Sequence, residues 1–390
     1  MNRKSKITII GGGIGGLVCA ISLKQKGFNN LQIFERRTEA QSVGAGFVIW
    51  ANAGWVLNEL GLLDGVAKLG GRLKQMQRWT DQGEYLGAVD ITKIDQGIGY
   101  PSYAVGQAEF QHFLQYKANE LGIVIRNNQS VIDIEDSSPE KSFLRFEDGS
   151  KVEADIVIGA DGRMNSIARK YVQKENNPVY QNYINWIGIL ESDNPLPIEN
   201  NVLDYWGCGA RFGIVPINKY KMYWAGCKAS PLDSVNTAET DKEELLNIFN
   251  NWPALIRRVI KDTQNQNIKR IPIFDHNPNP NWFRNRVCLL GDAAHASLPT
   301  SGQGACQAME DGWHLSEAMA AFPTLPEVFD AYQNIRFEKT TAITISAREF
   351  ALSLFNTQEA FCLKRNDIAK STDYEKSANG MIGLWSKNLK

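Results

Sequence analysis

Glycines spaced to leave room for a phosphate group lie near the start of the chain. They follow the pattern G-x-G-x-x-G at Gly11, Gly13 and Gly16. In this pattern the first glycine permits a tight turn, the second lets the backbone approach a pyrophosphate, and the third lets a helix lie close to a strand. A helix that begins at Ile14 would direct its free amide groups and its positive dipole end at the phosphates. These residues therefore predict a dinucleotide-binding turn.

An acidic residue follows these glycines at the distance at which a carboxylate accepts hydrogen bonds from ribose hydroxyls. Glu35 lies 19 residues beyond Gly16, as expected for a ribose-binding carboxylate. Two arginines, Arg36 and Arg37, come directly after it. Two interpretations of these arginines stay open: they contact the adenine, or they are solvated at the surface.

Two further segments place a glycine–aspartate pair next to an apolar run. Asp161-Gly162 follows an apolar run that we expect to be a central parallel strand. The reverse pair, Gly291-Asp292, ends another apolar run, and a tail rich in glycine follows it: Pro299, Gly302, Gln303 and Gly304. One glycine motif suggests a nucleotide, whereas three in this order predict contacts to different parts of one cofactor.

Together the three segments resemble those of the para-hydroxybenzoate hydroxylase family, the single-component class A flavoprotein monooxygenases, over about residues 5 to 345. Salicylate-type hydroxylases and tetracycline-inactivating monooxygenases belong to the same group. The resemblance implies that the segment around Asp161 and Gly162 serves both FAD and NAD(P)H. It also implies that Asp292, next to Gly291, hydrogen-bonds the ribityl chain. The residues that it implies along the isoalloxazine ring are Pro299, Gly302, Gln303 and Gly304, of which Pro299, Gly302 and Gly304 shape the reactive edge.

The chain departs from the family pattern at one position. Many members have an arginine in a V-H-R-x-x-L segment that contacts the flavin, and Gln107 stands in its place here. Glutamine keeps a donor but lacks the charge and the two-pronged geometry of arginine. Gly46, with Gly44 and Ala45, matches the loop near the flavin in this family, and an ordinary turn is the alternative.

The elements that must position these motifs alternate between two patterns. A strand at 6–10, a helix at 14–26 and a strand at 31–34 form a strand–helix–strand unit. Hairpin and antiparallel patterns interrupt such units twice. We therefore predict an α/β fold in which a mainly antiparallel β-sheet substrate domain is inserted into a Rossmann-like FAD-binding domain, followed by C-terminal helices. The predicted FAD-binding parts are 1–72, 101–177 and 272–345, the substrate parts are 73–100 and 178–271, and the C-terminal segment is 346–390.

Aromatic residues of the inserted sheet are the candidates for contact with a substrate. Side chains alternate between the two faces of a strand, so Arg211 and Phe212 point to opposite faces, as do Tyr223 and Trp224. The family resemblance places this sheet over the flavin, which makes all four residues pocket candidates. Packing in the core or on the surface is the alternative for each. An arginine at this position would suit a carboxylate, phenolate or enolate.

The totals exclude several other classes of protein. A net charge of −1 argues against a nucleic-acid partner, and no apolar stretch approaches a membrane span. The cysteines and histidines lack metal-ligand spacing, so no metal is expected, and free thiols fit a cytoplasmic location. No second G-x-G-x-x-G follows a strand, so NADPH or NADH would bind transiently. The oligomeric state, monomer or homodimer, stays open.

The predicted reaction is hydroxylation of an aromatic or polycyclic, enolic small molecule by O₂ through a flavin C4a-hydroperoxide. Two alternatives stay open at this point. One is a flavin-dependent reductase of polyprenyl or polyketide double bonds, and the other is a flavoprotein that binds a ligand without catalysis. Neither the substrate nor the choice between NADH and NADPH follows from the sequence, because fold does not determine function.

Overall fold

The computed structural model describes residues 1–38, 46–138, 140–232 and 240–389. Its first layer is a six-stranded sheet in which every pair of neighbours is parallel except the edge pair β18–β19. The central strands β12 and β1 are entirely buried, and Thr8 is their only polar residue, because helices and loops cover both faces. In order across the sheet, the strands are β18 (Phe283–Arg284), β19 (Val287–Leu289), β12 (Ile156–Gly159), β1 (Ile7–Ile10), β2 (Leu31–Phe34) and β8 (Val124–Arg126).

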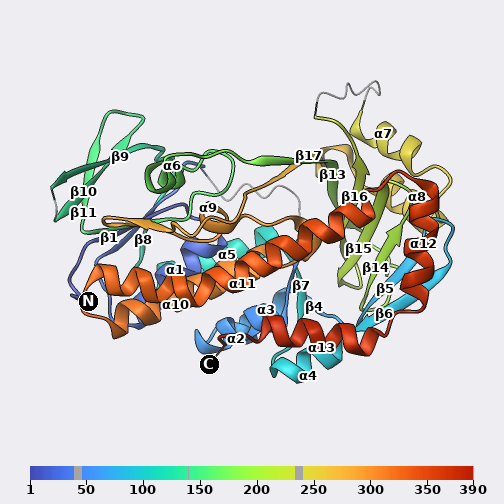
Figure 1. Ribbon diagram of the computed structural model, residues 1–390, viewed down its shortest axis with the longest axis horizontal. Coiled ribbons are helices and arrows are strands. Elements are labelled where there is room, and N and C mark those ends of the chain that lie inside the picture. The colour runs from blue at the N-terminus through green and yellow to red at the C-terminus, as the bar shows by residue number, and fades with distance from the viewer. Residues whose placement is uncertain (39–45, 139, 233–239, 390) are drawn as a thin grey trace.

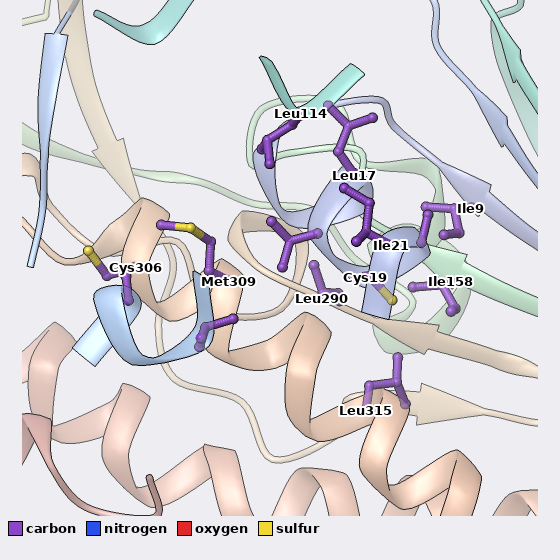
Figure 2. Close-up of a cluster of buried hydrophobic side chains, with 14 of the residues drawn as sticks. Ile9, Leu17, Cys19, Ile21, Leu114, Ile158, Leu290, Cys306, Met309 and Leu315 are labelled. Carbon is purple, nitrogen blue, oxygen red and sulfur yellow. The ribbon is translucent and has the colours of Figure 1, made fainter. Parts of the chain in front are cut away.

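Three helices build the core around this sheet: α1 (Ile14–Gln25), α5 (Gln107–Glu120) and α10 (Gly304–Ala321). Helix α1 lies against both α5 and α10. Figure 2 shows side chains of α1 between those of the sheet and those of α10. The labelled residues of this cluster are Ile9, Leu17, Cys19, Ile21, Leu114, Ile158, Leu290, Cys306, Met309 and Leu315, and all ten are buried.

The second layer is a seven-stranded sheet built from two separate parts of the chain. Its neighbours are antiparallel except β14 and β5, which are parallel. Helices α7 (Asp241–Ile248) and α8 (Ala254–Asp262) cover one face. In order, its strands are β17 (Ile268–Asp275), β13 (Val179–Glu191), β16 (Lys221–Ala229), β15 (Ala210–Asn218), β14 (Asn201–Trp206), β5 (Gln75–Thr80) and β6 (Tyr85–Asp90).

Two small sheets and five short helices complete the body of the fold. The sheet β3-β7-β4 lies between the two large sheets, since β7 and β3 contact strands of the seven-stranded sheet. Its strands are β3 (Gly46–Ile49), β7 (Tyr103–Gly106) and β4 (Gly71–Arg72). The other sheet has β9 (Val131–Ser138), β10 (Lys141–Phe146) and β11 (Lys151–Ala154). The short helices are α2 (Ala51–Glu59), α3 (Leu63–Leu69), α4 (Ile91–Ile98), α6 (Ile167–Gln173) and α9 (Asp292–His295).

A long helix connects the two layers. Helix α11 (Leu325–Leu354) runs from the six-stranded sheet to the seven-stranded sheet, as Figure 1 shows in orange. It begins with a capping box between Thr324 and Glu327. Helices α12 (Glu359–Lys370) and α13 (Tyr374–Trp385) then return along the molecule, and α13 lies against α4 and β6. Among the described residues, no helix is long and apolar enough to cross a bilayer.

The predicted fold class is confirmed: the parallel sheet alternates with helices, the mainly antiparallel sheet is inserted twice, and helices follow at the C-terminal end. One of the expected hairpins joins β5 to β6. The residues at which we divide the chain into domains stay a prediction. The sheet β3-β7-β4 was not expected, because its strands pair only after the chain has folded.

Candidate functional site

The glycine turn after β1 has the shape that a phosphate group requires. Gly11 has φ +109°, and a β-carbon there would lie 2.2 Å from the carbonyl oxygen of Ala160. A β-carbon at Gly16 would lie 2.1 Å from the oxygen of Gly11, whereas one at Gly13 would meet no atom within 4 Å. The backbone at Gly13 is therefore open where α1 begins at Ile14 without a side-chain cap. These residues fit the pyrophosphate of a dinucleotide.

Glu35 lies at the carboxyl end of β2, beside this turn. Its carboxylate accepts hydrogen bonds from the amides of Gly12 at 2.8 Å and Arg37 at 3.0 Å. This position agrees with the predicted ribose contact, which stays a prediction. The side chains of Arg36 and Arg37 are exposed, as both interpretations allow.

Helix α5 brings a polar side chain to the turn that sequence reasoning missed. Gln111 is buried, and its Nε2 donates to the carbonyl oxygen of Gly12 at 3.1 Å. Gln107 lies one turn earlier, half-buried at the first position of the helix. Helical spacing from Gln107 could have identified Gln111 as its neighbour on the same face. Gly46 begins β3, which pairs with β7 just before Gln107, while Gly44 and Ala45 lie outside the described residues.

The Asp161-Gly162 segment connects to helix α6 through the aspartate. Asp161 accepts the hydroxyl of Ser166 at 2.5 Å and the amide of Ala168 at 3.1 Å. Burial raises the pKa of Asp161, and the hydrogen bond from Ser166 opposes that shift. Arg169, in the same helix, donates from Nη1 to the carbonyl oxygens of Ala293 and Ala294, both at 3.0 Å. These bonds join the second motif to the third.

The third motif turns sharply at Gly291, which has φ +61°. Its amide donates to Asp311 Oδ2 at 2.9 Å, and the same oxygen lies 2.5 Å from His295 Nε2. His295 and the amide of Gly291 therefore share one carboxylate oxygen, which connects this loop to α10. Asp292 is half-buried at the start of α9, and a β-carbon at Gly304 would lie 4.0 Å from its Oδ1. The carboxylate thus lies next to the N-terminus of α10.

The turn from Pro299 to Gly304 presents backbone rather than side chains. Pro299 and Gly302 are exposed, Gly304 is half-buried, and Gly302 has φ +62°. The indole nitrogen of Trp50 donates to the carbonyl oxygen of Gly302 at 2.9 Å. Because α10 begins at Gly304, its first amide groups and dipole favour a negatively polarised oxygen here. This geometry suits a flavin carbonyl edge, and the roles of these residues stay predictions.

Gln303 lies in the same turn, but its side chain points away from the exposed backbone. It is 1% exposed, accepts a hydrogen bond from Asn52 at 2.9 Å and accepts another from Gln307 at 3.0 Å. Only its backbone is left for the predicted contact with the isoalloxazine ring. The physical reason is that a buried amide satisfies its polar atoms inside the protein.

A buried charge network lies directly behind this turn, and sequence reasoning missed it. Arg336 of α11 donates to Glu310, to Asp311 at 2.7 Å and to Gln307 at 2.5 Å. Lys339 donates to both oxygens of Glu310, at 3.0 and 2.9 Å. Burial opposes the ionisation of Glu310, but Arg336 and Lys339 lower its pKa below the ordinary value. The network fixes α10 to α11, and its residues are too far apart in sequence to form a motif.

Two of the four predicted substrate contacts are wrong. Phe212 and Trp224 have no exposed surface, and their rings stack 5.4 Å apart. They pack with Phe249 in the core beneath α7 and α8. The alternation of faces was predicted correctly, but this pair lies on the face that the helices cover.

Arg211 and Tyr223 lie on the other face, which is turned toward the turn that begins at Pro299. On this face Cys227, the Cα partner of Arg211, is in one apolar cluster with Leu298, the residue before Pro299. A β-carbon at Gly46 would lie 2.3 Å from the ring of Tyr223. These contacts place both side chains between the seven-stranded sheet and the predicted flavin residues.

Arg211 is held in place with part of its guanidinium unused. Its Nε donates to Asp204 Oδ1 at 2.6 Å, and Trp206 donates to the other oxygen of Asp204 at 2.9 Å. Within the described residues Arg211 makes no other hydrogen bond, and 19% of its side chain is exposed. Burial opposes its charge, but Asp204 raises the pKa of Arg211 above the ordinary value. A fixed cation with free terminal nitrogens is suited to binding an anion.

Comparisons with known proteins show the family to which the chain belongs. The profile of the FAD binding domain family matches residues 4–346. Over 85% of each chain, the sequence is 32% identical to an aurachin C monooxygenase/isomerase of Stigmatella aurantiaca. It is 31% identical to an FAD-dependent urate hydroxylase of Mycolicibacterium vanbaalenii, over 88% of this chain and 87% of that one.

A solved structure has the same fold over nearly its full length. The crystal structure of Klebsiella pneumoniae HpxO complexed with FAD and uric acid matches with a TM-score of 0.90 and 26% identity, over 98% of each chain. A tetracycline destructase, at 17% identity and a TM-score of 0.73, shares the fold. The family profile and the full-length relatives lead to one conclusion: the chain belongs to the FAD-binding-domain family and is an FAD-dependent monooxygenase.

Proposed function

We propose that the enzyme hydroxylates a planar, electron-rich aromatic or N-heteroaromatic compound that binds as an anion, such as a phenolate, an enolate or a deprotonated ring. The observation that carries this proposal is Arg211. Its Nε is committed to Asp204, its terminal nitrogens are unused, and it lies on the sheet face turned toward Pro299. Anionic rings are also electron-rich, which is the property that an electrophilic hydroxylation requires.

The relatives support this class of substrate. The similar proteins include several urate hydroxylases and a 3-hydroxybenzoate 6-hydroxylase of Aquipseudomonas alcaligenes, which is 25% identical over 97% of this chain. Urate and hydroxybenzoate are both planar, and both are anions at neutral pH. The pocket side chains of this chain nevertheless decide which anion binds here.

The residues of the chain bind, orient and shield the substrate. The chemistry that bound FAD supplies is acceptance of a hydride from NAD(P)H and activation of O₂ for the transfer of one oxygen atom. Arg211 would hold the anionic edge of the ring and keep it deprotonated. Tyr223 stays protonated, since burial raises its pKa, and would donate to a substrate oxygen. The seven-stranded sheet would exclude water from the reacting edge.

NAD(P)H would act as a transient reductant, since NAD(P)H is the usual reductant of this family and no second dinucleotide motif follows a strand. We place the reaction in the cytoplasm, where both the reductant and a reducing environment are available. The free cysteines support this location, because all six are unpaired in the structure.

The test is oxygen incorporation measured with isotopically labelled O₂. Purified enzyme with bound FAD is given NAD(P)H and a panel of urate, hydroxybenzoates, hydroxyquinolines and their neutral N- or O-methylated analogues. We expect one acidic compound to accelerate NAD(P)H oxidation and to gain one labelled oxygen atom. Label that comes from water, or turnover without O₂, would contradict a monooxygenase.

The role of Arg211 is tested with Arg211→Lys, which keeps a cation beside Asp204 but loses the planar fork. We expect kcat/KM for the acidic substrate to fall about tenfold to 100-fold, the range for a lost charge-assisted hydrogen bond. The matched control is Arg270→Lys, a half-buried arginine paired with Glu244 beside the other face of the sheet. An equal loss in both variants would contradict the assignment of Arg211.

A further inference from the structure

A tyrosine hydroxyl is buried on the substrate-facing side of the seven-stranded sheet. Tyr183 of β13 is 1% exposed, and its hydroxyl has no hydrogen-bond partner within the described part of the chain. Two other tyrosines that are buried or half-buried have one: Tyr180 donates to Ser230 at 2.8 Å, and Tyr332 donates to Leu289 at 3.2 Å. A buried polar group without a partner is uncommon in folded proteins, so a missing partner requires an explanation.

The ring of Tyr183 cannot turn its hydroxyl toward solvent. It stacks on Phe355 with ring centroids 4.0 Å apart and an interplanar angle of 17°. It also packs in one apolar cluster with Cys227 and Leu298. The thiol of Cys227 donates to Asn185 at 3.2 Å, so it has a partner other than the tyrosine. The hydroxyl is therefore held in a fixed direction.

Tyr183 shares its environment with the cation that we assign to the substrate. Cys227 is the Cα partner of Arg211 and packs against Tyr183. Burial raises the pKa of Tyr183 strongly, the Cys227 side chain adds to the shift, and Arg211 and Arg163 oppose it. The hydroxyl is therefore protonated at neutral pH and can act as a donor.

We propose that Tyr183 contacts the substrate and donates its hydroxyl hydrogen bond to an oxygen or ring nitrogen of the anion that Arg211 holds. Two fixed groups on one face, a cation and a neutral donor, would set the orientation of a planar ring. Tyr183 would then decide which ring atom faces the flavin. This inference rests on the proposed function, since it requires an anionic substrate on this face of the sheet.

The perturbation is Tyr183→Phe, which removes one oxygen and keeps the stacked ring. We expect KM for the substrate to rise about tenfold, the upper range for a neutral hydrogen bond. We also expect more hydrogen peroxide per NAD(P)H consumed, because a wrongly oriented ring receives less oxygen. Kinetics, product analysis and peroxide quantification measure these effects in the holoenzyme.

The matched control is Tyr180→Phe, three residues earlier in the same strand. Its hydroxyl has a partner, Ser230, within the protein. Without substrate, we expect Tyr180→Phe to lower the urea midpoint and Tyr183→Phe to leave it unchanged or raise it. With substrate, we expect only Tyr183→Phe to change KM.

The outcomes separate this inference from the proposed function. If ligand-free Tyr183→Phe loses as much stability as Tyr180→Phe, the hydroxyl has an internal partner and the inference is overturned. The inference also fails if the wild type and Tyr183→Phe hydroxylate a panel compound with the same KM and the same amount of peroxide per NAD(P)H consumed. In that case the proposed function stands. If no panel compound is hydroxylated, the proposed function fails, and the ligand-free comparison decides whether the hydroxyl is unpaired.

Discussion

Arg336 is the centre of the buried charge network, and its removal tests whether that network supports the flavin turn. Its guanidinium bonds to Glu310, Asp311 and Gln307, and the side chains of Arg336, Glu310 and Asp311 have no exposed surface. Arg336→Met keeps most of the stem and removes the charge. In this variant Asp311 keeps two hydrogen-bond partners, the amide of Gly291 and the ring of His295. Glu310 keeps its ion pair with Lys339.

The expected loss follows from this burial. Breaking one side of a fully buried ion pair leaves a charge without compensation and costs about 3–5 kcal/mol. We expect Arg336→Met to lower the free energy of unfolding by that amount. Because Gln307 bonds to Gln303, and Asp311 bonds to Gly291, the two loops assigned to FAD would loosen together. FAD should therefore bind at least tenfold more weakly, by about 1.4 kcal/mol or more.

The assay is urea unfolding at constant m-value, together with flavin fluorescence titration of the apoprotein. Arg145→Met is the control, because Arg145 forms an ion pair with Asp133 at 3.0 Å in which both side chains are more than 40% exposed. That pair should contribute less than about 1 kcal/mol. If Arg336→Met also loses less than about 1 kcal/mol and keeps its FAD affinity, the reasoning from burial is refuted.

Two further predictions concern pH and the C-terminal helices. Burial lowers the pKa of His314 to about 4 from an ordinary 6.5, so its contribution to stability is present above pH 6.5 and is lost as pH falls toward 4. Wild type should lose about 3 kcal/mol more than His314→Gln between neutral and acid pH, measured by urea unfolding; equal losses would contradict this. Trp385→Ala removes a ring 5.0 Å from Trp50, which bonds to Gly302, and should weaken FAD binding several-fold by fluorescence titration. Phe361→Ala, exposed in α12, is its control, and equal effects would show that Trp385 has no special role.

The parts of the site that the sequence predicted depend on interactions between near neighbours. Gly11, Gly13 and Gly16 are required by one strand–turn–helix unit, and the structure gives that unit the expected form. The apolar runs became central strands because burial on both faces selects apolar side chains. The family motifs also predicted FAD as the cofactor, since each motif is a short pattern of neighbouring residues.

The substrate face could be predicted only in part. Alternation along β15 and β16 separated Arg211 from Phe212 and Tyr223 from Trp224, and the register between the two strands then placed Arg211 and Tyr223 on one face. Which pair is left uncovered depends on where α7 and α8 pack, and those helices belong to a later part of the chain. Nothing within either strand encodes that choice. Tyr183 was missed for the same reason, since its unpaired hydroxyl is recognised only after its surroundings are known.

By itself the sequence determined the glycine turn before α1, the order of strands and helices, and the family, because these depend on residues a few positions apart or on fixed motifs. Only the tertiary structure decided that Gln303 turns inward, that Arg336 and Lys339 of α11 neutralise Glu310, and that Trp385 of α13 packs against Trp50. The physical reason is that these contacts join segments far apart in sequence, and they form only when burial excludes water from groups that would otherwise be solvated.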